Sequence, residues 1–290
     1  MSTRKSKHQD TIEAPSGTHT TTRQKVTVGH KTMVITEYHT ERSTTIYIGS
    51  DKIYCVDITL SKDIGHTYKS RGFLTKIRWD GECSLYHPFE KGTDTIMILK
   101  LAMTYLHRNY PTVSHLTFTD MSTRQCDNGA SVSLSGMKLF TDGKTWYETQ
   151  FHAVMDPDYQ SAYDAMMKYA TELKHTLPWE TFVYDTVNNP TILGINQIRE
   201  VYQKSTTWQE FFCYVRSQLG VSKFCICLSE KGWFDQFIQT RLRFHLMSVQ
   251  YLIDPSQYDT EYTFEPMQGG KAKGVQHGRP TLRKKSRHPS

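Results

Sequence analysis

Alternating apolar and polar side chains predict a run of β-strands after the polar N-terminus. Residues 31–40, 43–49 and 52–60 are rich in Val, Ile, Thr and Tyr and partly alternate, as half-buried strands do. The short polar connectors between them indicate an antiparallel meander. Residues 73–80 alternate well enough to form a further strand.

Over residues 95–109 the spacing of apolar residues changes from every second position to about every three and a half positions, which predicts a helix. One stripe of this helix carries Ile96, Leu99, Met103 and Leu106, as expected for a helix packed on a sheet. Thr93 or Asp94 is expected to cap its N-terminus, and Pro111 marks its end.

The next strand, 114–120, is expected to lie parallel to 73–80, because a strand–helix–strand unit crosses over right-handedly. Residues 130–140 are expected to form another strand or a mixed segment. Residues 141–151 are expected to form a tight turn at Gly143 and a short helix. These elements predict an α/β fold, with a mixed sheet and one crossover helix.

The second half of the chain is predicted to be mainly helical. Apolar spacing indicates helices at 157–175, 194–204, 207–219 and 232–247, the third ended by Gly220, and a closing strand at 248–254. The predicted organisation is a disordered tail over 1–23, an α/β domain over 24–155, a helical C-terminal extension packed on it over 156–255, and a disordered basic tail over 256–290.

The formal net charge of +6 is concentrated at the two ends of the chain, so the body between them is mildly acidic. Residues 271–290 contain no acidic side chain. Their basic residues are Lys271, Lys273, Arg279, Arg283, Lys284, Lys285 and Arg287. Such a tail can bind nucleic acid or an anionic membrane surface by counterion release, act as a nuclear import signal, or simply remain solvated.

The six cysteines are scattered and form no C-x-x-C pair. Cys225 and Cys227 lie two residues apart, a spacing that would place two reduced thiols on one face of a strand over 224–228. We therefore expect neither disulfides nor structural zinc. The 13 histidines contain no close pair at ligand spacing, and no metal site is expected.

No membrane span is expected from the apolar runs of the sequence. The longest, 95–103, is interrupted by Lys100 and is far shorter than the roughly 20 residues that a spanning helix needs. The N-terminus is polar and lacks the pattern of a secretory signal. The expected location is therefore intracellular.

Three places carry candidate chemistry. Gly92, at a strand-to-helix junction, can bind a phosphate with the helix N-terminus, although a glycine there also serves a tight turn. Asp120 follows the parallel strand, where ligands of open sheets gather, and is either catalytic or the acceptor of an Asx-turn or helix cap. Tyr147, in GKTWYETQF, carries either a functional hydroxyl or a structural hydrogen bond.

This order of elements resembles the GNAT N-acyltransferase superfamily over about residues 52–153. In that family two neighbouring strands splay apart to admit the pantetheine arm of acyl-CoA, and a Q/R-x-x-G-x-G/A turn wraps its pyrophosphate. The resemblance implies acetyl-CoA as the cofactor, bound at Gly92 with backbone N–H groups of Thr93 and Thr95. It also implies that Tyr147 protonates the departing thiolate.

Three residues depart from the family pattern. Phe89 lies where the family has Gln or Arg, and Asp94 lies where it has the second glycine of the turn. Phe151 lies where the family has the glycine that follows the tyrosine. A carboxylate at Asp94 would repel a pyrophosphate unless it caps the helix and faces away. The implied acceptor is an amine or a protein, and the candidates for its base are Glu82, His87, Glu90 and, preferred among them, Asp120.

The segments 92–93, 119–122 and 143–151 also resemble a group of uncharacterised proteins of large DNA viruses that share a GKTWYE-x-x-F signature. This resemblance implies a viral origin and a location in the host cytoplasm, the nucleus or the virion. The sequence thus predicts an acyl-CoA-dependent N-acyltransferase with Tyr147 and Asp120 as catalytic residues. The alternative is a non-catalytic GNAT-like viral structural or binding protein whose basic tail contacts nucleic acid.

Overall fold

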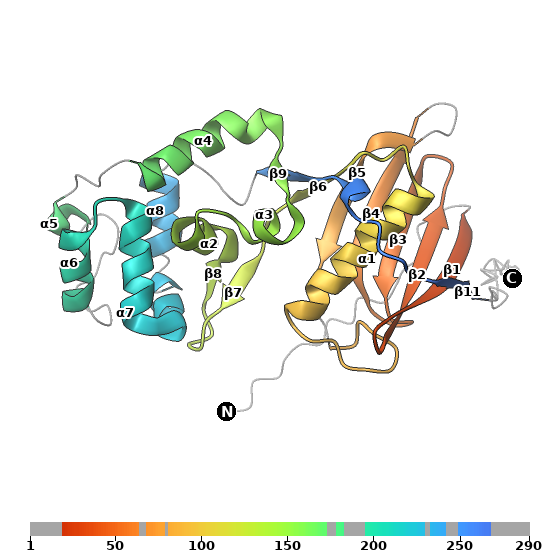
Figure 1. The fold of residues 1–290 in the computed structure, drawn as a ribbon, viewed down its shortest axis with the longest axis horizontal. Helices are drawn as coiled ribbons and strands as arrows, with labels where there is room; N and C mark the ends of the chain where they lie inside the picture. Colours follow the sequence, from red (N-terminus) through yellow and green to blue (C-terminus); the bar gives the residue numbers. More distant parts are fainter. Residues whose placement is uncertain are drawn as a thin grey trace, which may run out of the picture.

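The main feature of the structure is a nine-stranded mixed sheet. The structure is a computed structural model that describes residues 19–63, 68–78, 81–172, 178–182, 195–229, 233–241 and 249–267. From edge to edge, the strands are β11 (Phe264–Pro266), β1 (Thr20–Val28), β2 (Lys31–His39), β3 (Ser43–Gly49), β4 (Tyr54–Lys62), β5 (Tyr68–Ile77), β6 (His115–Thr119), β10 (Gln250–Ile253) and β9 (Val154–Met155). Neighbouring strands are antiparallel except β5 and β6 (Figure 1).

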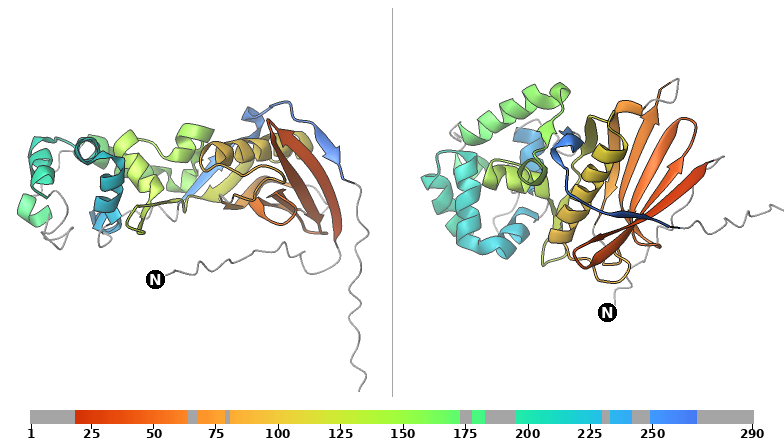
Figure 2. Two further views of the ribbon diagram at one scale, coloured as in Figure 1. Left: turned by 90° about the horizontal axis from the view of Figure 1, so that it is seen from below. Right: turned by 45° about the vertical axis from the view of Figure 1, so that its right-hand side comes forward.

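Helix α1 (Thr93–Asn109) connects β5 to the parallel strand β6, as predicted. It lies against one face of the sheet (Figure 2) and buries an apolar stripe that includes Leu99, Met103 and Leu106. At its C-terminal end the Tyr110 hydroxyl donates a 2.5 Å hydrogen bond to Glu37 on β2. The α/β fold with a mixed sheet and a crossover helix is confirmed.

Residues 130–140 combine a short strand with a helix, so of the two expected alternatives the mixed segment is confirmed and the continuous strand is wrong. A short hairpin of β7 (Thr123–Gln125) and β8 (Ser131–Ser133) leads into α2 (Leu134–Asp142). Ser133 starts α2 because its hydroxyl accepts the backbone N–H of Gly136. Gly143, at φ 72°, ends α2 and provides the predicted turn before α3 (Trp146–Phe151).

The later helices gather beyond the β9 edge of the sheet (Figure 1). They are α4 (Pro157–Thr171), α5 (Trp179–Phe182), α6 (Ile195–Lys204), α7 (Trp208–Ser229) and α8 (Trp233–Arg241). Their core is aromatic and includes the fully buried side chains of Trp208, Phe212 and Phe237. Gly220 has a positive φ, as predicted, but the helix resumes after it, so 224–228 is helical and the expected strand there is wrong.

Both ends of the described chain contribute strands to the sheet. Strand β1 starts at Thr20, and β11 pairs with it through residues 264–266. These residues therefore belong to the folded body and not to the predicted tails. Strand β10 lies between β6 and β9, so the sheet includes residues from the segment predicted as a helical extension. The seven basic residues of 271–290 lie outside the described residues.

Two disulfides join distant parts of the chain, which contradicts the expectation of reduced cysteines. Cys55 of β4 is bonded to Cys83, and Cys126 of the β7–β8 hairpin is bonded to Cys225 of α7. The pairs are 28 and 99 residues apart in sequence. Local spacing could not indicate them, because only the tertiary fold brings their sulfur atoms within bonding distance.

Candidate functional site

Strands β5 and β6 pair over only three positions and then separate. The pairs are Arg71↔His115, Gly72↔Leu116 and Phe73↔Thr117. Beyond them lies a cavity of about 210 Å³ whose lining includes Leu74, Thr75, Phe118 and Thr119. Successive side chains of a strand point to opposite faces of the sheet. Because consecutive residues of both strands line this cavity, it reaches both faces of the sheet.

A second cavity, of about 360 Å³, adjoins the first and extends to the start of α1. The two share Ile77 and Tyr147 among their lining residues, and the second also reaches Gly92 and Thr95. Basic side chains line them, namely Lys76, Arg78 and Lys91, whereas no described Asp or Glu does. A lining of this charge favours an anionic ligand.

Helix α1 begins at this cavity without a capping side chain among the described residues. Its N-cap is Gly92, at φ 92°, a conformation that side-chain-bearing residues rarely adopt. The expected cap by Thr93 or Asp94 is wrong: Asp94 Oδ2 instead accepts the backbone N–H of Glu90 at 2.5 Å. The N–H groups of the first turn have no partner within the helix, and such groups bind phosphates in other proteins.

The GKTWYE segment forms the start of α3 through a reciprocal capping box. The Thr145 hydroxyl accepts the Glu148 N–H at 3.3 Å, and the Thr145 N–H donates to Glu148 Oε2 at 2.6 Å. The Tyr163 hydroxyl of α4 donates to Glu148 Oε1 at 2.8 Å. These contacts fix the first turn of α3 and with it the position of Tyr147.

Tyr147 lies where the two cavities meet. Its side chain lines both of them, although the residue is only 4% exposed, and its ring centroid is 4.4 Å from that of Phe118. Burial, followed by the negative charge of Asp120, raises the pKa of the Tyr147 hydroxyl, so it keeps its proton at neutral pH. In the described part of the chain no group hydrogen-bonds this hydroxyl, so the structural hydrogen bond left open by the sequence is not found there.

Asp120 lies behind the cavity wall and does not line either cavity. Its Oδ1 accepts the Ser122 N–H at 2.9 Å and the Ser122 hydroxyl at 2.5 Å, which is the Asx-turn geometry. Its Oδ2 is buried and meets no donor among the residues described. Burial raises the pKa of Asp120, against the two Ser122 hydrogen bonds, which lower it. Asp120 is therefore placed as a turn residue near Tyr147 and not as a base facing a substrate.

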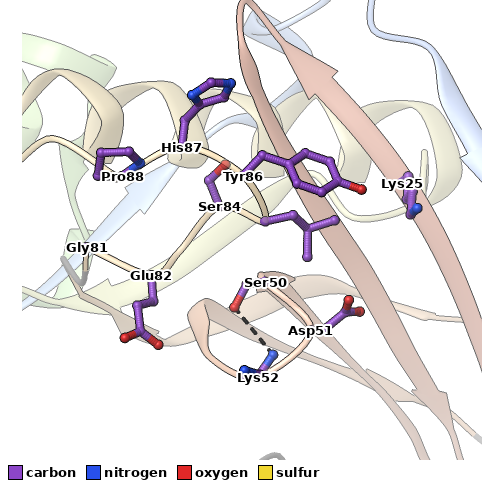
Figure 3. A pocket seen from close by; sticks show the side chains of 11 residues that line it. Lys25, Ser50, Asp51, Lys52, Gly81, Glu82, Ser84, Tyr86, His87 and Pro88 are labelled. Atoms are coloured by element: carbon purple, nitrogen blue, oxygen red, sulfur yellow. Dashed lines mark hydrogen bonds between the residues drawn. The ribbon is translucent and has the colours of Figure 1, made fainter.

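The other candidate bases lie elsewhere. Glu82 and His87 line a separate hollow of about 520 Å³, formed by the 81–88 segment opposite the Ser50–Lys52 turn (Figure 3). Glu90 is exposed and lines neither cavity between β5 and β6. No candidate base chosen from the sequence faces these cavities.

Sequence reasoning located part of this site. Gly92, Thr95 and Tyr147 line the cavities, whereas Thr93 does not. The lining residues that the sequence did not indicate include Lys76, Arg78, Lys91 and Trp146. The basic residues at the end of β5 and before α1 were a readable signal, but only the end of the β5–β6 pairing shows that they face a cavity.

No cluster of three or more His, Cys, Asp or Glu side chains within the described ranges is arranged to hold a metal ion. None of the helices described is both long and apolar enough to cross a bilayer. No family model, curated protein or solved structure was found to match the chain.

Proposed function

We propose that the chain is an N-acyltransferase that uses acetyl-CoA, with its active site in the opening between β5 and β6. The observation that carries this proposal is the pair of adjoining cavities that passes between two splayed parallel strands. The uncapped start of α1 lies at one end of the passage, and Tyr147 lies where the cavities meet. A splay of this kind is also what the GNAT resemblance implies.

The donor's phosphates would bind at the α1 end of the passage. The backbone N–H groups that follow Gly92 and the side chains of Arg78 and Lys91 supply positive charge there. The larger cavity alone, and the two together, fall within the roughly 300–1,000 Å³ typical of small-molecule sites. The site therefore has the charge and the size that a phosphorylated thioester requires.

Bound acetyl-CoA would supply the activated acyl group. Tyr147 would hold a proton at its phenolic oxygen and give it to the leaving sulfur. Backbone N–H groups of β5 beyond Phe73, which do not pair with β6, are available to the carbonyl oxygen that becomes negative. Leu74, Ile77 and Phe118 exclude water along the passage.

No described carboxylate lines the cavities, so an acceptor amine would have to lose its proton to water before it attacks. For a lysine-like amine, whose unperturbed pKa is about 10.4, the turnover rate should then rise with pH across the neutral range. This dependence follows from the absence of a facing base in the described part of the site.

A melting experiment with acetyl-CoA tests the proposal. A ligand present at about 100 times its Kd stabilises the folded state by about 2.7 kcal/mol, so the melting temperature should rise by several degrees. Gly92→Ala should weaken this effect, because Gly92 needs φ 92° at the anion-binding turn.

Gly29→Ala is the matched control, since Gly29 also has a positive φ, at 62°, but lies in the β1–β2 turn away from both cavities. It should lower the melting temperature without changing the shift caused by acetyl-CoA. No shift of the unmodified protein at millimolar acetyl-CoA would contradict the proposal and would favour a non-catalytic binding protein.

A further inference from the structure

Asp94 stands where the GNAT resemblance places a second glycine, two residues after Gly92. Its side chain is only 9% exposed and lines neither cavity. Its Oδ2 lies 2.5 Å from Nζ of Lys31, at the start of β2. The carboxylate is thus held on the buried side of the turn.

Lys31 has almost no exposed surface. Its side chain is 5% exposed, and its Nζ donates to the backbone carbonyl of Pro88 at 2.5 Å. The same ammonium group lies 5.7 Å from the ring centroid of Phe89. Since Asp94 also accepts the N–H of Glu90, one ion pair joins β2, the segment before α1 and the first turn of α1.

The charge at this turn decides whether it can hold an anion. A helix N-terminus carries a partial charge of roughly +0.5, which an uncompensated carboxylate in the first turn would more than cancel. With Lys31 in contact, the charge of Asp94 is neutralised within the pair. The positive end of α1 then adds to the charge of Lys91 and of Arg78, whose Nε also donates to the Tyr54 carbonyl at 3.1 Å.

We propose that Lys31 is a positioning residue for the anion-binding end of this cavity. It holds the Asp94 carboxylate on the buried side of the turn and cancels its charge, which leaves the N–H groups after Gly92 available to a phosphate. This inference rests on the proposed function, because the anion in question is the phosphate group of acyl-CoA. It also explains how a chain with an acid in place of a glycine can keep such a site.

The test compares three variants by calorimetric titration with acetyl-CoA, with the melting temperature of each recorded. Lys31→Met leaves the Asp94 charge uncompensated and should raise the Kd for acetyl-CoA by about tenfold or more. Asp94→Asn leaves an extra positive charge and should leave the Kd unchanged or lower it. Lys31→Met/Asp94→Asn should bind within about threefold of the unmodified protein.

The difference between the two single substitutions, of which only Lys31→Met should weaken binding, separates this role from a purely structural one. A pair that only stabilised the fold would make both single variants bind worse, because each leaves one buried charge without its partner. Lys138→Met is the matched control, since Lys138 forms a 2.5 Å ion pair with Asp142 on α2 and lines neither cavity. Its Kd should equal that of the unmodified protein.

Weaker binding by both single variants to the same extent would overturn the inference, and so would a Kd of Lys31→Met equal to that of the unmodified protein. If Lys31→Met does not fold, the double variant decides: binding near that of the unmodified protein supports the inference, and a loss of binding contradicts it. A lack of acetyl-CoA binding by the unmodified protein would instead overturn the proposed function itself.

Discussion

The Tyr147 hydroxyl is the single group whose removal should separate chemistry from binding. Tyr147→Phe keeps the ring contacts with Phe118 and Trp146 and removes only the proton donor. The kcat for acyl transfer should fall by roughly 10²–10⁴-fold, whereas the Kd for acetyl-CoA and the melting temperature should change little. Steady-state kinetics and calorimetry on the same preparations measure both quantities.

Tyr110→Phe provides the comparison, because Tyr110 is also a buried tyrosine but lines neither cavity. It loses its hydrogen bond to Glu37, which should lower the free energy of unfolding by about 1.5–3 kcal/mol without changing kcat. Equal losses of kcat in the two variants would show that Tyr147 acts through stability alone.

Since the pKa of Tyr147 is raised above 10.0, the activity should not fall between pH 8 and about pH 10.

Asp120→Asn should show how much the buried carboxylate of Asp120 lowers the free energy of unfolding. Because the pKa of Asp120 is raised in the folded state above the ordinary 3.8, folding favours its protonated form. The stability that the protonated Asp120 contributes is therefore present at low pH and is lost as the pH rises through the pKa of the folded state. Asn can still accept both Ser122 hydrogen bonds, so the variant should gain stability relative to the unmodified protein between pH 4 and pH 7.

Thermal unfolding of both proteins across this pH range tests the point. A stability difference that does not change with pH, or that favours Asp120 at pH 7, would mean that the carboxylate has a partner in solution that compensates its charge.

At the scale of elements, regular periodicity was enough to predict α1, α3, α4 and α6, because each has local signals in its own sequence. The apolar stripe of 95–109 and the turn at Gly143 are examples. The helix over 224–228 was mistaken for a strand, because a short apolar run fits both structures and only packing decides between them. The sequence does not predict the helix over 134–140, because its start depends on the cap that Ser133 forms with the Gly136 N–H.

The residues of the candidate site were predictable only where the local sequence itself indicates a role. Gly92 was found because a strand-to-helix turn favours glycine, and Tyr147 because of its aromatic context. The role of Asp120 was not predictable, because the direction of its side chain depends on the register of β6. Thr119 is exposed there, whereas the flanking Phe118 and Asp120 are buried. Lys31 lies 63 positions before Asp94 in the sequence, and nothing local connects the two.

The disulfide between Cys126 and Cys225 should stabilise the contact between the β7–β8 hairpin and α7. It closes a separation of 99 residues, for which the loss of chain entropy in the unfolded state predicts about 2–5 kcal/mol. Cys126→Ser/Cys225→Ser should therefore lower the free energy of unfolding by that amount in denaturant titrations. Peptide mapping without reductant should first recover the Cys126–Cys225 and Cys55–Cys83 peptides; free thiols at all four positions would contradict the structure.

At the scale of the whole molecule, the sheet brings together segments from both ends of the described chain. Strand β10 lies between β6 and β9, and Tyr251 on it stacks against Phe118 beside Tyr147. A chain truncated before Gln250 should therefore lose both its sheet and its acetyl-CoA binding. The closing strand predicted at 248–254 is confirmed by β10, but its place between β6 and β9 could not be read from the sequence, because no local signal connects these strands.

The basic segment 271–290 remains a prediction from composition. Its seven basic residues should give DNA binding that weakens steeply with salt, and deletion of the segment should abolish it. Gel-shift titrations between 50 and 200 mM salt, with and without 271–290, measure this. DNA binding that survives the deletion and does not respond to salt would exclude the segment as the nucleic-acid contact.

Hydrogen–deuterium exchange with and without acetyl-CoA tests the central claim most directly, because it reports where the ligand binds. Acetyl-CoA should protect the backbone amides of residues 92–96, at the start of α1, and of 74–77, on the unpaired part of β5. The matched helix start at residues 134–137 of α2, which is capped by Ser133, should show no change. Protection that is absent at saturating acetyl-CoA, or confined to residues away from the β5–β6 opening, would contradict the proposed active site.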